Sequence, residues 1–98
     1  MVDSSRGSGV LVPAPSVHTR LFDGELVILD LARGEYLALD AIGSILWKGL
    51  EAGRTVEDVA REIVTEYDVS LEQLTADLAS LTDDFVARGL FVVKGGDP

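Results

Sequence analysis

The stretch Leu26–Asp40, LVILDLARGEYLALD, is the part of the sequence that predicts most about the fold. Two apolar runs, Leu26–Leu31 and Glu35–Leu39, are separated by the residues Ala32–Gly34. Short apolar runs on either side of a glycine-containing turn are typical of a β-hairpin. We therefore predict two strands joined at this turn, followed by a helix that Asp40 is placed to cap.

A further strand is predicted before this hairpin, over Ser16–Phe22, because Asp23-Gly24 supplies the left-handed backbone of a tight turn. The run Leu26–Leu31 is apolar on both faces, so we expect it to be the central strand of a three-stranded meander, buried on both sides. Residues 1–15, which begin with a Ser/Gly-rich segment, are expected to form a flexible arm. The folded domain should then span residues 16–94, with a short tail over 95–98.

Three helices are predicted after the hairpin. Asp40 begins the first, Thr55 with Asp58 resembles a capping box for the second, and Ser70 with Gln73 resembles one for the third. The third helix carries a clean apolar stripe of Leu71, Leu74, Leu78, Leu81 and Phe85. Glycines 53 and 89 should end the first and third helices, and Leu90–Val93 reads as a short closing strand.

The order of three strands, three helices and one strand indicates an α+β domain with a segregated antiparallel sheet. Three short helices closed by a strand resemble a winged helix-turn-helix, with the last strand in the wing. Trp47 lies on the first helix and is expected to pack at the junction of sheet and helices; a role as a recognition anchor is the alternative.

The residue types of catalytic and metal sites are sparse. The sequence has no cysteine, which excludes a disulfide framework, a zinc–thiolate site and a thiol nucleophile. His18 is the single histidine, and Asp83 and Asp84 are adjacent, so that a helix points them about 100° apart. No acidic or histidine cluster has the spacing of metal ligands. We therefore predict a protein that is not an enzyme and has no metal or cofactor.

Charge and hydropathy limit the class of partner. The formal net charge is −9, from 17 acidic and 8 basic residues, which disfavours nucleic acids and anionic lipids. The sequence has neither an apolar run of about 18 residues nor the pattern of a signal peptide. We expect a cytoplasmic protein with no membrane-spanning segment.

The winged-helix interpretation raises DNA binding or regulation as an alternative function. The third helix would then be the recognition helix, yet Ser70–Gly89 carries four acidic residues and one basic residue, a net charge of −3. Affinity for DNA comes mostly from neutralising phosphates, so this charge argues against the alternative.

The predicted third strand, Glu35–Leu39, lies at an edge of the meander. Leu37 and Leu39 share one face and enter the core, whereas Tyr36 and Ala38 share the other. Glu35 is its only charge, although natural edges are usually protected by Lys, Pro or a bulge. Three readings remain open: the arm or a helix covers the edge, an extended peptide adds to it as a strand, or a second copy pairs with it in a homodimer.

The segment Leu29–Asp40 has the pattern Leu-Asp-x-x-x-Gly-x-Tyr-x-x-Leu-Asp. It is followed by Gly43, Ile45-Leu46-Trp47, Gly53-Arg54-Thr55-Val56, Tyr67, Leu81 and Arg88-Gly89-Leu90. With this ordered set, Val27–Phe91 resembles the PqqD-like family, whose members are recognition elements for ribosomally synthesised and post-translationally modified peptides (RiPPs). The pairs Gly34-x-Tyr36 and Gly43-x-x-x-Trp47 look most like the stand-alone members that serve lasso-peptide biosynthesis.

The resemblance implies a winged helix-turn-helix with an N-terminal three-stranded sheet. It implies that the ligand is the leader segment of a precursor peptide, bound as an added antiparallel strand on the third strand, in a groove walled by the third helix. The protein would catalyse nothing itself. It would deliver the precursor to a separate leader peptidase, after which a macrocyclase acts, and would be a monomer or a weak homodimer.

The resemblance also implies a set of leader-binding residues. The strand wall comprises Gly34, Glu35, Tyr36, Leu37, Ala38 and Leu39. With Leu74 pointing to the core, 100° steps place the helix wall at Asp77, Leu81, Asp84 and Arg88, with Phe85 below them. The opposite flank, Thr75, Leu78, Thr82 and Val86, remains the alternative. Asp77 and Asp84 would pair with Lys or Arg of a leader, or would simply be solvated.

Overall fold

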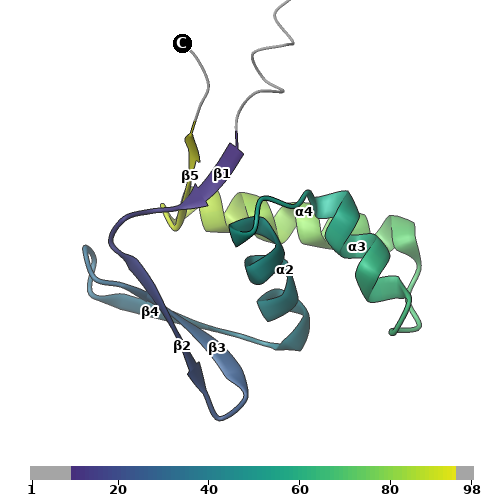
Figure 1. Ribbon diagram of the computed structural model, residues 1–98, viewed down its shortest axis with the longest axis horizontal. Coiled ribbons are helices and arrows are strands. Elements are labelled where there is room, and N and C mark those ends of the chain that lie inside the picture. Colours follow the sequence, from purple (N-terminus) through teal and green to yellow (C-terminus); the bar gives the residue numbers. More distant parts are fainter. Residues whose placement is uncertain (1–9, 95–98) are drawn as a thin grey trace, which may run out of the picture.

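The computed structural model describes residues 10–94, which form an α+β fold of three helices, a three-stranded antiparallel sheet and a separate strand pair (Figure 1). The strands are β1 (Val10–Pro13), β2 (Val17–Phe22), β3 (Glu25–Asp30), β4 (Glu35–Leu39) and β5 (Phe91–Lys94). The helices are α2 (Ala41–Glu51), α3 (Val56–Val64) and α4 (Leu71–Ala87). The predicted fold class is confirmed at this level.

The strand β1 corrects the predicted N-terminal arm. Val10–Pro13 pairs antiparallel with β5, so that Pro13 lies opposite Phe91, and the Ala14 N–H donates to the Leu90 carbonyl at 2.9 Å. The prediction of a flexible arm is therefore wrong for this part of residues 1–15. The rest of the predicted arm, residues 1–9, and the predicted tail, residues 95–98, lie outside the described residues.

The two hairpins of the sheet are formed by local turn chemistry. Asp23 and Gly24 have φ values of 54° and 84°, the left-handed backbone that a two-residue hairpin turn requires. In the second turn, one carboxylate oxygen of Asp30 accepts hydrogen bonds from the backbone N–H groups of Ala32 and Arg33. Both predicted hairpins are confirmed, and Asp30 stabilises the turn that leads into β4.

The helix starts follow the predicted caps. Asp40 accepts a hydrogen bond from the Gly43 N–H at 2.8 Å, and Thr55 with Asp58 forms a reciprocal capping box. These caps satisfy backbone donors that have no partner within the helix. They fix where α2 and α3 begin.

The cap of α4 is only half of the predicted box. Ser70 accepts from the Gln73 N–H at 3.0 Å, but the Gln73 side chain donates forward to Asp77 at 2.9 Å. A side chain one turn further along the helix therefore takes the amide that was expected to return to Ser70. Gly89, at φ 77°, follows the last turn of α4 as predicted.

The core lies between the sheet and the helices. Helix α2 packs against β3 and β4, and α3 and α4 pack against α2. The ring centroids of Trp47 lie 5.1 Å from Phe85 and 4.5 Å from Phe91, and all three side chains are buried. Trp47 is thus a core residue, as predicted.

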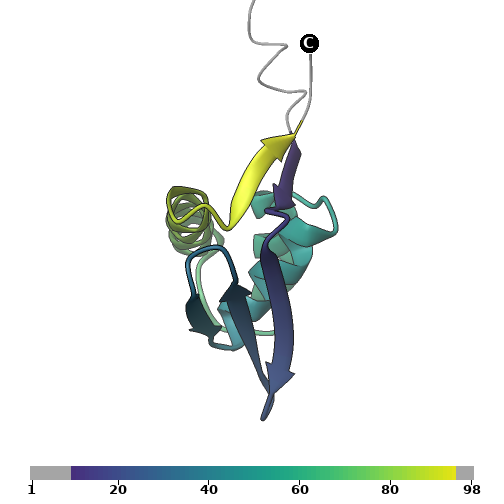
Figure 2. The same cartoon turned by 90° about the vertical axis from the view of Figure 1, so that its left-hand side faces the viewer.

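The helices cover only one face of the sheet (Figures 1 and 2). On β3, Leu26 and Ile28 are buried beneath them, whereas Val27 and Leu29 on the other face are only half-buried. Leu31 follows the strand and is 63% exposed. The prediction that Leu26–Leu31 is buried on both faces is wrong, because no second layer among residues 10–94 packs on this face. Within the same residues, no helix combines the length and the apolar character needed to cross a bilayer.

Candidate peptide-binding site

The strand β4 is an unpaired edge of the sheet. It pairs with β3 on one side, and no strand in the described part of the chain pairs with the other side. Leu39 is buried and Leu37 half-buried on the core face, whereas Tyr36 is 75% exposed and Ala38 is exposed on the outer face. This confirms the predicted alternation of the two faces, and it removes the reading in which a described segment adds a strand over the edge.

The direction of each backbone group follows from two hydrogen bonds at the ends of β3. The Leu31 N–H donates to the Ser16 carbonyl at 3.0 Å, so its backbone faces β2. Backbone groups alternate from side to side along an antiparallel strand, so those of Asp30 and Ile28 face β4. The bond from the Gly34 N–H to the Asp30 carbonyl, at 2.8 Å, agrees with this.

The register then identifies the free groups of β4. Asp30, Ile28 and Leu26 lie opposite Glu35, Leu37 and Leu39, so these three β4 residues direct their N–H and C=O groups to β3. Tyr36 and Ala38 must direct theirs to the open edge. These two residues offer an incoming strand two donors and two acceptors.

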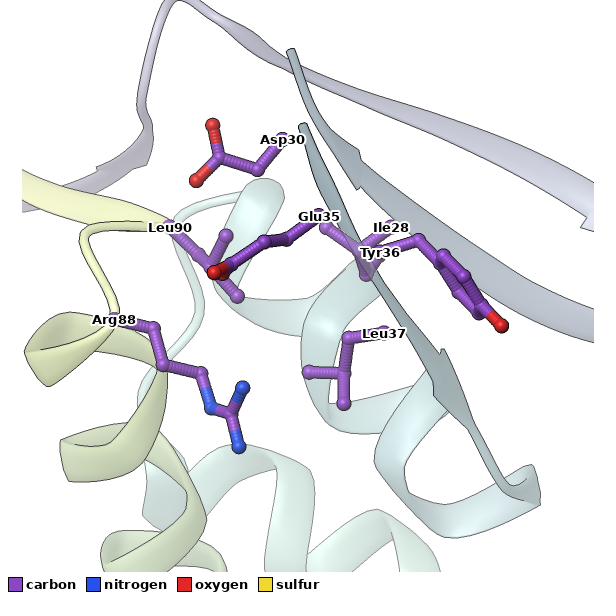
Figure 3. A pocket seen from close by; sticks show the side chains of 7 residues that line it. All are labelled: Ile28, Asp30, Glu35, Tyr36, Leu37, Arg88 and Leu90. Atoms are coloured by element: carbon purple, nitrogen blue, oxygen red, sulfur yellow. The ribbon is translucent and has the colours of Figure 1, made fainter. Parts of the chain in front are cut away.

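A first cavity lies between β4 and the end of α4 (Figure 3). It is lined by Ile28, Asp30, Glu35, Tyr36, Leu37, Arg88 and Leu90. Figure 3 shows the guanidinium group of Arg88 reaching from α4 towards Leu37, while the ring of Tyr36 points away from it. Side chains of both predicted walls therefore meet at this end of the edge.

A second cavity, of about 280 Å³, lies where β4 passes into α2. Its lining comprises Asp40, Ile42, Gly43, Val69, Gln73, Leu74, Asp77, Leu78 and Leu81. Because the chain enters β4 at the first cavity and leaves it at the second, the two cavities mark the two ends of the open edge. In Figure 2, β4 is the strand of the sheet nearest to α4, and β2 is the farthest.

The predicted helix wall faces this edge. Asp77 and Leu81 line the second cavity and Arg88 the first. Asp84 lies between them in sequence and accepts a hydrogen bond from the Arg88 Nε at 3.0 Å. Phe85 was predicted as a leader-binding residue below this wall, but it is fully buried and packs against Trp47 and Phe91 in the core, so a bound leader would not reach it. Gly34, the first residue of the predicted strand wall, is exposed in the turn before β4 and has a φ of 68°.

The alternative flank of α4 faces elsewhere. Thr82 is 8% exposed and lines a third cavity together with Leu11 of β1 and Arg54 before α3. Its hydroxyl donates to the Leu78 carbonyl at 2.8 Å. Of this flank, only Leu78 also lines a cavity beside β4. The geometry favours the first flank as the helix wall.

Several lining residues are missing from the predicted site. Asp30 is 6% exposed, and one of its carboxylate oxygens lies 4.0 Å from the Arg33 Nε. Asp40 and Gln73 were predicted only as helix caps. Caps lie at helix starts, and here two helix starts meet at one end of the strand edge, which the linear sequence does not reveal. Across residues 10–94, no group of three His, Cys, Asp or Glu side chains is placed to hold a metal ion.

The family described as "Coenzyme PQQ synthesis protein D (PqqD)" matches residues 25–90. A comparison with curated proteins gave no match.

Two solved structures are similar to the chain over most of its length. "Lasso peptide synthetase B1 complexed with the leader peptide" is 26% identical, with a TM-score of 0.79, covering 84% of this chain and 96% of that one. "TbiB1 in Complex with the TbiA(beta) Leader Peptide" is 30% identical, with a TM-score of 0.74, covering 89% and 99%. The family match spans about two thirds of the 98 residues, so this chain belongs to the PqqD family and is a PqqD-like RiPP recognition element.

Proposed function

We propose that this protein binds the leader segment of a ribosomally synthesised precursor peptide, as an antiparallel strand added to β4, in lasso-peptide maturation. The observation that carries the proposal is the open edge of β4, where Tyr36 and Ala38 direct unpaired backbone groups towards a groove walled by α4. Both solved relatives are complexes with leader peptides. Strand addition supplies affinity through the main chain, and side-chain pockets supply selectivity.

The register of β4 determines how such a leader would lie. An antiparallel strand runs from the second cavity to the first, opposite to β4. Leader residues opposite Leu39, Leu37 and Glu35 share the core-side face of the sheet and enter the groove. Those opposite Ala38 and Tyr36 point to the outer face. Every second leader side chain would therefore face α4, and the second cavity, of about 280 Å³, has room for one of them; the first, of about 10 Å³, has room for about one water.

The outer face of the sheet is where we propose that the leader peptidase docks. Val27 and Leu29 are only half-buried there, beside exposed Ala38, Tyr36 at 75% and Phe22 at 72% exposure. Apolar side chains that remain exposed together, here beside His18 and Arg20 of β2, are typical of a protein interface. A leader bound to β4 would extend this face with its own outward side chains. A peptidase docked on this face would then contact both this protein and the bound precursor peptide. In this way the protein would present the precursor to the peptidase.

The protein acts in the cytoplasm and catalyses no step itself; the peptidase and then a macrocyclase carry out the chemistry. Its three helices and the β1–β5 pair serve as a winged helix-turn-helix scaffold in which α4 faces a peptide. The gain for the enzymes comes from the raised local concentration of the precursor.

Amide hydrogen exchange tests the strand addition residue by residue. The probe is the leader peptide of either solved relative, titrated into the full chain. We expect slower exchange at the Tyr36 and Ala38 amides on binding, because these N–H groups become bonded. The amides of Thr19 and Leu21, which face the other open edge of the sheet, serve as internal controls and should not change. Binding without protection at Tyr36 and Ala38 would exclude this mode.

A further inference from the structure

The second cavity joins an apolar floor to an acidic rim. The floor is formed by Ile42, Val69, Leu74, Leu78 and Leu81, and the rim by Asp40, Gln73 and Asp77. The exposed side chains of Val69 and Leu71, at 44% and 42%, continue the apolar surface at the start of α4. A pocket of about 280 Å³ has room for one long side chain of a bound peptide.

The rim carboxylates differ from two other acidic groups near the groove, Asp84 and Asp30. Asp84 is paired with Arg88 at 3.0 Å, and Asp30 lies 4.0 Å from Arg33. Among the side chains that the structure describes, no basic group lies within ion-pair distance of Asp40 or Asp77. Among residues 10–94, the two rim carboxylates therefore have no ion-pair partner, whereas at the Arg88 end Arg33 and Arg88 pair with two of the three acids Asp30, Glu35 and Asp84.

Each rim carboxylate is held in place by a hydrogen bond to one of its two oxygens. The Gln73 amide donates to one oxygen of Asp77 at 2.9 Å, and the Gly43 N–H donates to one oxygen of Asp40 at 2.8 Å. Each carboxylate can accept at its second oxygen as well. Two oriented acceptors above an apolar floor suit a side chain with a long apolar stem and a donating, positively charged tip.

We propose that the second cavity takes a lysine or arginine of the bound leader, and that Asp77 determines this specificity. The inference rests on the proposed function and adds to it the chemistry of one leader residue. With an antiparallel leader, that residue lies opposite Leu39 or just before it. Its stem covers the apolar floor and its tip lies between Asp40 and Asp77. An acidic residue there would be repelled by both carboxylates.

The test compares peptides that differ only in the tip of one side chain. The leader peptides of the two solved relatives are made with Lys, norleucine or Glu at each position in turn. Each is titrated into the wild-type chain, Asp77→Asn and the matched control Asp83→Asn. Asp83 is an exposed acid on the same helix that lines neither cavity beside β4.

At one position near the N-terminal end of the added strand, Lys should bind about fivefold more tightly than norleucine at low salt, the upper range for exposed ion pairs. The preference should weaken as salt is raised, disappear in Asp77→Asn and persist in Asp83→Asn. In Asp77→Lys, Glu should become the preferred residue at the same position. That reversal separates a charge effect from a change of pocket shape.

Equal affinity for Lys and norleucine at every position would overturn the inference, as would a Lys preference that survives in Asp77→Asn. Either result would leave the proposed function intact, because the peptides would still bind. Failure of every peptide to bind the folded protein would instead overturn the proposed function, and this inference with it.

Discussion

The three-stranded sheet has two outer strands, β2 and β4, and of these two β4 is the one that lies beside helix α4. Both direct outwards backbone groups that no other described strand pairs: Tyr36 and Ala38 on β4, and by the same alternation Thr19 and Leu21 on β2. No residue of β2 lines either cavity beside α4. Hydrogen-bonding capacity is therefore common to both edges, and what distinguishes β4 is the helix that faces it.

The residues of the two strands differ in the same direction. The exposed His18 and Arg20 on β2 supply the polar and charged side chains by which natural sheets discourage pairing at an edge. On β4 the only charged residue is Glu35, at the start of the strand. An unprotected strand edge can therefore bind a peptide selectively only where neighbouring pockets contact the side chains of that peptide.

The largest effect is expected where a substitution damages the sheet itself. Leu37→Pro removes an N–H that is bonded to β3 and also a half-buried side chain. The free energy of unfolding should fall by about 3 kcal/mol, from an unpaired partner carbonyl and lost packing. Chemical denaturation would measure it. An unchanged unfolding midpoint would show that the backbone N–H of Leu37 faces the open edge. The backbone groups of Tyr36 and Ala38 would then face β3.

The next largest effect tests directly whether the leader binds at β4 and not at β2. Ala38→Pro removes an outward N–H from β4 and restricts the strand, so leader affinity should fall by roughly 30-fold, the loss of about 2 kcal/mol. Thr19→Pro removes an outward N–H from β2 and is the matched control, for which we expect unchanged affinity. Fluorescence anisotropy with a labelled leader peptide measures both. Equal losses in the two variants would mean that β4 is not the binding edge.

A smaller effect should distinguish the two flanks of α4. Leu81→Ala removes an apolar side chain from the second cavity, and affinity should fall by about fivefold to 20-fold as buried area is lost. Val86, on the alternative flank, is 40% exposed, and Val86→Ala should leave affinity unchanged. Calorimetric titration gives both values. A loss in Val86→Ala alone would assign the groove to the opposite flank.

The smallest effect is expected at the Arg88 end of the groove. Arg88→Ala leaves Asp84 without its partner and removes a positive charge from this end of the groove. A leader should then bind more weakly at low salt. The loss should be only about twofold to threefold, because exposed ion pairs contribute little. The difference should vanish at high salt. A larger loss that persists at high salt would show instead that Arg88 acts through packing of its stem against Leu37.

Much of the fold could be predicted because its signals are local. The bounds of β4, the caps at Asp40 and Thr55, and the glycines after α2 and α4 all depend on residues within one turn of one another. The β1–β5 pair could not be predicted in this way. It joins two four-residue strands from opposite ends of the described chain. Neither apolar run contains a signal that indicates which other segment it pairs with.

The candidate site was predictable only in part. The alternation of Tyr36 and Leu37 follows from the strand period, and 100° steps placed Asp77, Leu81 and Arg88 on one face of α4. Which face turns towards β4 depends on how α4 packs on α2 and β5, and that packing also brings Asp40 and Gln73 to the rim. The predicted burial of β3 on both faces failed for the same reason, since it required a second layer, which residues 10–94 do not supply.

By itself, the stretch Leu26–Asp40 determined the β-hairpin, its exposed and buried faces and the start of the first helix, because turn geometry and side-chain alternation are short-range properties of the chain. Only the tertiary structure decided that β4 is open at its backbone through Tyr36 and Ala38 among residues 10–94, that the Asp77 flank of α4 lines the cavity beside its end, and that Asp40 and Asp77 lie at the rim of that same cavity. These depend on strand register and helix packing, which are set by contacts between residues far apart in the sequence.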